Sequence, residues 1–178
     1  MKRAVAFFLW AAAHVRAASP MARPGAAETT WAKGLWPEVG SNTVPEGTPN
    51  YQPQMSEAPA INVDVAGWLA LPGTEISGPV LQTTDNEYYL RRDITRQYSE
   101  WGSYFADYEC NLSSVENLSR ITVLFGHSLG DDPQQAHFSQ IKNYSDPEFC
   151  MAHPFIEFQL WHHPSLRWQV FAAGVVPA

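Results

Sequence analysis

Residues 126–130 hold the side chains of this chain that are best suited to catalysis. They read Gly126-His127-Ser128-Leu129-Gly130 and follow the apolar run 121–125. As a G-x-S-x-G motif, this segment would place Ser128 on a strand-to-helix elbow as the nucleophile of a serine esterase. Alternatively, it places His127 at the end of a β-strand, where an imidazole transfers protons for a nucleophile carried elsewhere. The elements around the motif have to support one interpretation or the other.

The esterase hypothesis needs a large α/β sheet with crossover helices. The chain shows no pattern for such helices, and Pro133 disfavours a helical conformation at Asp132, where the helix after the elbow should begin. A triad would also need an acid and a histidine downstream, and nothing in the sequence places His153, His162 or His163 in that role. The esterase using Ser128 therefore stays the weaker alternative.

Other chemistry has little support in the sequence. The two cysteines, Cys110 and Cys150, form no C-x-x-C pair, and the adjacent His162-His163 pair lacks the spacing of zinc ligands. We expect no metal and no cofactor. We interpret both cysteines as ordinary thiols and His162-His163 as part of a hairpin loop.

The chain past residue 60 is patterned as a mainly β fold. Short runs rich in apolar and aromatic residues alternate with turn signals. Strands are predicted at residues 67–71, 79–83, 103–108, 120–125, 154–161 and 166–176. A helical turn is expected at 88–90, and short helices are expected between 134 and 150. The segment 71–75 contains Pro72-Gly73 and is interpreted as a turn, although its letters resemble a sorting signal. Six strands with few helices predict a barrel or a sandwich.

The N-terminal third differs from this domain. Residues 1–19 combine Lys2-Arg3 with an apolar run and small residues, which predicts a signal peptide or short membrane anchor. Residues 20–60 contain seven prolines and are predicted to be an extended linker. The folded domain is expected to occupy residues 61–178. The formal net charge is -7 and the sequence has no Lys/Arg cluster, so nucleic acid is not an expected partner.

Gly102-Ser103-Tyr104-Phe105-Ala106-Asp107 and Phe125-Gly126-His127-Ser128 belong to an ordered set of motifs that runs from about residue 61 to residue 178. The first resembles the Gly-x-Ile-Phe-Leu-Asp strand of the class B sortases, and the second resembles the Tyr-Gly-His-Asn of that family. Further matching segments are Asn62 to Gln82, Asp85-Asn86-x-Tyr88-Tyr89-Leu90, Phe138-x-x-Ile141-x-x-Tyr144, Phe149-x-x-x-His153-Pro154 and Gln169 to Ala172.

This resemblance implies an eight-stranded β-barrel and a membrane-tethered cysteine transpeptidase on the outer face of a Gram-positive cell, or a secreted one. Such an enzyme cuts a sorting peptide of an exported protein and joins it to an amine of the cell wall or of a pilin. Its chemistry uses a Cys nucleophile, a His acid/base and an Arg that stabilises the oxyanion. Only the histidine carries over, to His127. The family's Thr-Leu-x-Thr-Cys strand and its Arg have no match in these residues.

The resemblance therefore predicts an incomplete barrel of about six of eight strands, which is inactive alone. A truncated or split gene, or a partner that completes the barrel in trans, would account for it. A non-catalytic domain that binds sorting peptides is a third hypothesis beside the sortase and the esterase.

Overall fold

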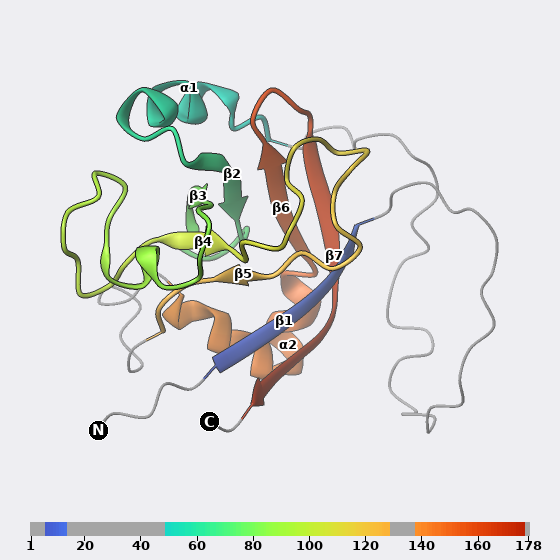
Figure 1. Ribbon diagram of the computed structural model, residues 1–178. Helices are drawn as coiled ribbons and strands as arrows, with labels where there is room; N and C mark the ends of the chain where they lie inside the picture. The colour runs from blue at the N-terminus through green and yellow to red at the C-terminus, as the bar shows by residue number, and fades with distance from the viewer. Residues whose placement is uncertain (1–5, 14–48, 129–137, 177–178) are drawn as a thin grey trace.

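The computed structural model describes residues 6–13, 49–128 and 138–176, with side chains for residues 49–128 and 138–170. Its strands form one seven-stranded sheet in the order β1-β7-β6-β2-β3-β4-β5. The sheet is curled, and its short helices lie at its ends (Figure 1). The elements are β1 (Ala6–Ala13), α1 (Gln52–Ile61), β2 (Val65–Ala70), β3 (Ser77–Leu81), η1 (Tyr88–Arg91), β4 (Tyr104–Ala106), β5 (Leu124–Phe125), η2 (Ser139–Ser145), α2 (Pro147–Ala152), β6 (Phe155–Leu160) and β7 (Ser165–Val176).

The six strands predicted from the sequence are all present as β2 to β7. Neighbouring strands pair antiparallel except β3 and β4, which pair in parallel. The short 3-10 turn η1 and the helices η2 and α2 also lie where the sequence predicts them. Within the described residues, β1 and β5 are the two edges of the sheet, which therefore forms an open, incomplete barrel.

The strand predicted over residues 120–125 is wrong in its length, because only Leu124–Phe125 belong to the sheet. Phe125 and Leu124 pair with Phe105 and Ala106 of the equally short β4. The amide N–H of Val123 instead contacts the thiol of Cys110 at 3.3 Å. A strand at the edge of a sheet has a neighbour on one side only, so its length is set by that neighbour.

The core consists of two hydrophobic clusters that share the central strands. Val80 belongs to the cluster that packs against η2, whereas its neighbour Leu81 belongs to the cluster around Tyr89 and Phe105. Successive side chains of a strand point to opposite faces, so one short strand contributes to both clusters. This arrangement fixes η1 against one face of β3 and β4.

Helix α1 corrects the prediction that residues 20–60 form an extended linker. Pro53 lies in the first turn, where its missing N–H costs no hydrogen bond. Pro59 lies in the last turn, and the side chains of Met55 and Ala58 are buried. Residues 52–60 are therefore part of the folded domain, and residues 20–48 lie outside the described part of the chain.

The apolar segment predicted to be a signal peptide or anchor contains strand β1. Its residues pair antiparallel with β7, from Ala6 opposite Val176 to Ala13 opposite Trp168. Figure 1 shows β1 alongside β7. In the described ranges, no helix combines the length and the apolar character needed to cross a bilayer.

Candidate active site around His127

His127 lies two residues beyond β5, at the edge of the sheet. Its backbone carbonyl accepts a hydrogen bond from the Phe138 N–H at 2.9 Å. Its half-buried ring contacts the main chain of η1, with Nε2 2.6 Å from the Leu90 carbonyl oxygen. The main chain at Phe138 and the main chain of η1 thus hold His127 in place, the first at its backbone and the second at its ring.

Gly126 has a packing role that differs from the elbow glycine of an esterase. A Cβ at this position would lie 2.2 Å from the ring of Phe138. Phe138 packs edge-on against Tyr104 of β4, with ring centroids 5.0 Å apart. The missing side chain at Gly126 therefore lets the aromatic pair close over the strand that precedes His127.

Ser128 does not have the environment of a nucleophile. Its hydroxyl is shielded from solvent and has no hydrogen-bond partner within the described part of the molecule. An activated serine needs a base within hydrogen-bond reach and access to a substrate. The G-x-S-x-G elbow is built on a largely parallel sheet, whereas in the described sheet only β3 and β4 pair in parallel. Leu129 and Gly130 lie outside the described residues.

The two cysteines lie in structural positions. The Cys110 thiol contacts the main chain before β5, at Val123 N and at Ile121 O. Cys150 lies in α2 and packs against the core, and burial raises the pKa of its thiol. A catalytic cysteine needs a lowered pKa so that thiolate is present near neutral pH. These environments support the interpretation of both residues as ordinary thiols.

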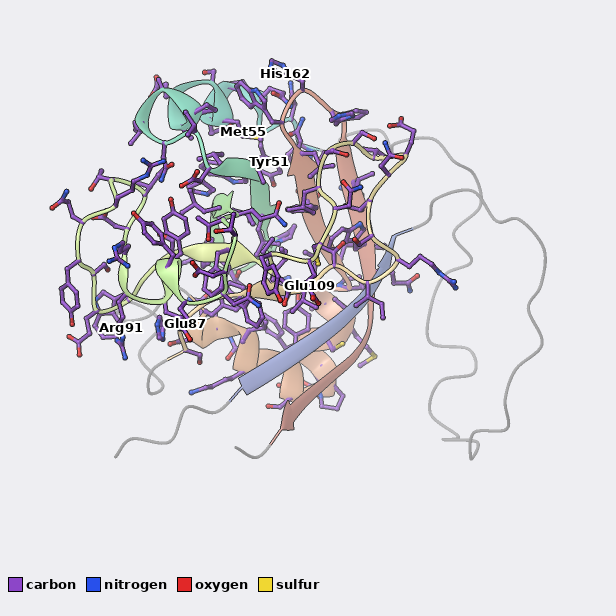
Figure 2. The ribbon with its side chains drawn as sticks, viewed as in Figure 1. Tyr51, Met55, Glu87, Arg91, Glu109 and His162 are labelled. Atoms are coloured by element: carbon purple, nitrogen blue, oxygen red, sulfur yellow. The ribbon has the colours of Figure 1, made fainter. Side chains whose placement is uncertain are left out.

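A pocket of about 640 Å³ lies at the other end of the domain and includes neither His127 nor η1. Its walls come from the residues before and within α1 and from the β6–β7 turn that carries His162 and His163. Figure 2 shows Tyr51 and His162 at the α1 end of the molecule, away from Glu87 and Arg91 beside η1. Among the described side chains, no three His, Cys, Asp or Glu residues converge as metal ligands would.

The imidazole of His127 can therefore hold and transfer a proton next to a strand edge that no other described strand covers. The sequence indicated the histidine through its Gly-His position after a strand. It did not indicate the Leu90 carbonyl, because a main-chain group has no side-chain signature. The sequence predicted only a helical turn at residues 88–90, within the family-like motif Asp85-Asn86-x-Tyr88-Tyr89-Leu90.

Similarity to known proteins agrees with this geometry. No family model matches the sequence. The chain is 34% identical to Sortase B of Staphylococcus aureus over 122 residues, which are 68% of this chain and 47% of that protein. The chain thus spans about half the length of this relative.

Solved structures give the same result. A sortase B complexed with triglycine superposes with a TM-score of 0.60 at 33% identity, over 69% of this chain and 54% of that one. A Staphylococcus aureus sortase B–substrate complex superposes with a TM-score of 0.59 at 34% identity, over 68% of this chain and 53% of that one. The mainly β sheet, curled as a half-barrel with few short helices, is the sortase B fold. Over this matched region, the chain belongs to the class B sortase family.

Proposed function

We propose that this chain provides the acid/base histidine of a sortase-type cysteine transpeptidase, and that His127 is that residue. The observation that carries the proposal is the position of its ring near the edge of β5 that no other described strand covers, on a class B sortase fold. An imidazole can accept the proton of a thiol and later protonate the leaving amine.

The nucleophile belongs to a different segment in this proposal. Burial raises the pKa of the Cys150 thiol, and the Cys110 thiol contacts the main chain at Ile121 and Val123. On one side, β5 pairs with no other strand among the described residues, so that edge can offer main-chain donors and acceptors. A Thr-Leu-x-Thr-Cys strand that pairs with this edge would bring its thiol to His127, and an Arg on the next strand would stabilise the oxyanion. The chain without that segment is expected to be inactive.

The partners follow from the relatives. The sortase B structures include a substrate complex and a complex with triglycine. We propose that the completed enzyme takes a sorting peptide of an exported protein and transfers it to an amine of the cell wall or a pilin. Residues 1–19 would direct the protein to the outer face of the cell membrane.

The test is complementation of the full chain. A polypeptide that carries the nucleophile and arginine strands of a class B sortase would be co-expressed with it, and cleavage of a sorting peptide would be measured. Cleavage should require the added cysteine. His127→Gln should lower the rate about 10²–10⁴-fold, the usual contribution of a general acid/base.

His163→Gln is the matched control, because that ring lies at the distant pocket. Undiminished cleavage by the complemented His127→Gln protein would refute the proposed role. Labelling of Ser128 by a fluorophosphonate, lost in Ser128→Ala, would support the esterase instead. Saturable binding of a sorting peptide without cleavage in the complemented protein would support a binding domain.

A further inference from the structure

The main-chain carbonyl of Leu90 has a specific relation to the histidine ring. We propose that this carbonyl is a positioning group that fixes the tautomer of His127, so that Nδ1 is the nitrogen that exchanges protons with the reactants. The inference deepens the proposed function and rests on it for the chemistry, but the geometry it uses can be measured without any activity.

The first step is the direction of the hydrogen bond. His127 Nε2 lies 2.6 Å from the Leu90 carbonyl oxygen. A carbonyl oxygen only accepts hydrogen bonds, so the proton must be on Nε2. A neutral imidazole with its proton on Nε2 has its lone pair on Nδ1. The base that removes a proton from a nucleophile is therefore Nδ1, and the nucleophile must approach that side of the ring.

The second step is the rigidity of the turn that presents the carbonyl. The Asp85 carboxylate accepts hydrogen bonds from the N–H groups of Glu87 and Tyr88, at 2.8 and 2.7 Å. The buried Tyr89 then anchors the turn, because its hydroxyl donates to Asp64 at 2.6 Å. The same hydroxyl accepts from the amide of Asn62, also at 2.6 Å. The residue next to Leu90 is thus tied to the core.

The third step is the close passage of the chain behind the turn. Gly102 has φ +59°, and a Cβ there would lie 2.6 Å from the Leu90 oxygen and 2.5 Å from the Tyr89 oxygen. The next N–H, that of Ser103, donates to the Tyr89 carbonyl at 3.1 Å. Only glycine leaves the two carbonyls this space and adopts this φ without strain. Gly102 therefore keeps the Leu90 carbonyl directed at His127.

The experiment observes the ring nitrogens of His127 by NMR in the full-length chain labelled with ¹⁵N, at a pH where the ring is neutral. His127→Gln identifies the signals by their loss. The expected result is a proton bonded to Nε2, with a nuclear Overhauser contact to the main chain of Leu90 or Arg91, and an unprotonated Nδ1. A proton on Nδ1, or two tautomers in comparable amounts without that contact, would overturn the inference in the unmodified protein.

Gly102→Ala supplies the second arm, with Gly73→Ala as the matched control. Both glycines have positive φ, but a Cβ at Gly73 would meet the His153 ring instead of the η1 carbonyls. The contact between His127 and Leu90 should be lost in Gly102→Ala and kept in Gly73→Ala. Retention of the contact in a folded Gly102→Ala protein would remove Gly102 from the proposal.

The result for the tautomer of His127 can be told apart from the result of the test of the proposed function. If the tautomer is as expected but complemented His127→Gln remains active, the proposed function fails and the positioning contact stands. If the tautomer is wrong but His127→Gln is inactive, only the positioning role of Leu90 fails.

Discussion

At the residue scale, the surroundings of a side chain distinguish two neighbouring residues of the G-x-S-x-G motif. His127 and Ser128 are adjacent, yet the imidazole contacts a carbonyl of another element whereas the hydroxyl is shielded from solvent. The same reasoning applies to Tyr89. Its hydroxyl accepts a hydrogen bond from Asn62, which is 2% exposed, and donates one to Asp64. Burial is the largest cause of the raised pKa of this phenol, and the hydrogen bond to Asp64 is the second.

The Tyr89 hydroxyl should be important for stability. Tyr89→Phe keeps the buried ring but leaves the Asn62 amide without one of its acceptors, so the free energy of unfolding should fall by about 1–3 kcal/mol. Denaturant titration would measure this. Tyr88→Phe is the control, because the ring of Tyr88 faces Arg92 and is less buried, and its effect should be about 0.5 kcal/mol or less. Equal losses for the two variants would contradict the role assigned to the hydroxyl.

At the element scale, strand register places a charged pair inside the domain. Glu157 of β6 lies opposite Arg167 of β7, and their side chains are 2.9 Å apart. The second carboxylate oxygen accepts a hydrogen bond from Tyr51, at the start of α1, at 2.6 Å. Because the Glu157 side chain is only 2% exposed, it needs both partners. Tyr51, which belongs to the segment predicted to be a linker, thus supplies one of the two partners of a buried carboxylate on the sheet.

Arg167→Met should be strongly destabilising. It leaves the buried Glu157 carboxylate without its cation, and breaking such a pair costs about 3–5 kcal/mol. Denaturant titration of Arg167→Met and of the double variant Arg167→Met/Glu157→Met should show that the second change restores part of the loss. Arg96→Met, which breaks the more exposed pair with Asp64, should cost less. Equal losses of stability in Arg167→Met and Arg96→Met would contradict the importance of the Glu157–Arg167 pair.

At the scale of the whole molecule, packing withdraws several tyrosine phenols from solvent. Burial is the largest cause of a raised pKa for Tyr51, Tyr89, Tyr104 and Tyr144. The unfolded chain releases these protons near the ordinary tyrosine value of 10.0, whereas the folded protein holds them to higher pH. The stabilisation is therefore fully present below pH 10 and is lost as the pH rises through the folded values.

The free energy of unfolding should consequently decrease steadily above about pH 10. Denaturant titrations across that range, with tyrosinate absorbance followed in parallel, would measure it. Tyr144→Phe removes one contributing phenol and should make the decrease less steep. A stability that stays constant while the buried tyrosines ionise would contradict the assignment.

The sequence alone determined the six strands, the turn before Leu90 and the candidate histidine. Those features depend on local patterns, such as apolar runs bounded by turn residues and a Gly-His pair at a strand end, which neighbouring residues establish by themselves. The interpretation of the two cysteines as ordinary thiols also came from their local context.

Only the tertiary structure decided the rest. Prolines in the first and last turns of α1 argued against a helix, yet the helix forms and buries Met55 and Ala58. The length of β5 depends on β4, and not on its own apolar run. The contact between His127 and Leu90 joins residues 37 positions apart through a main-chain oxygen, which every residue has. No sequence pattern marks such an atom, and folding alone brings it to the ring.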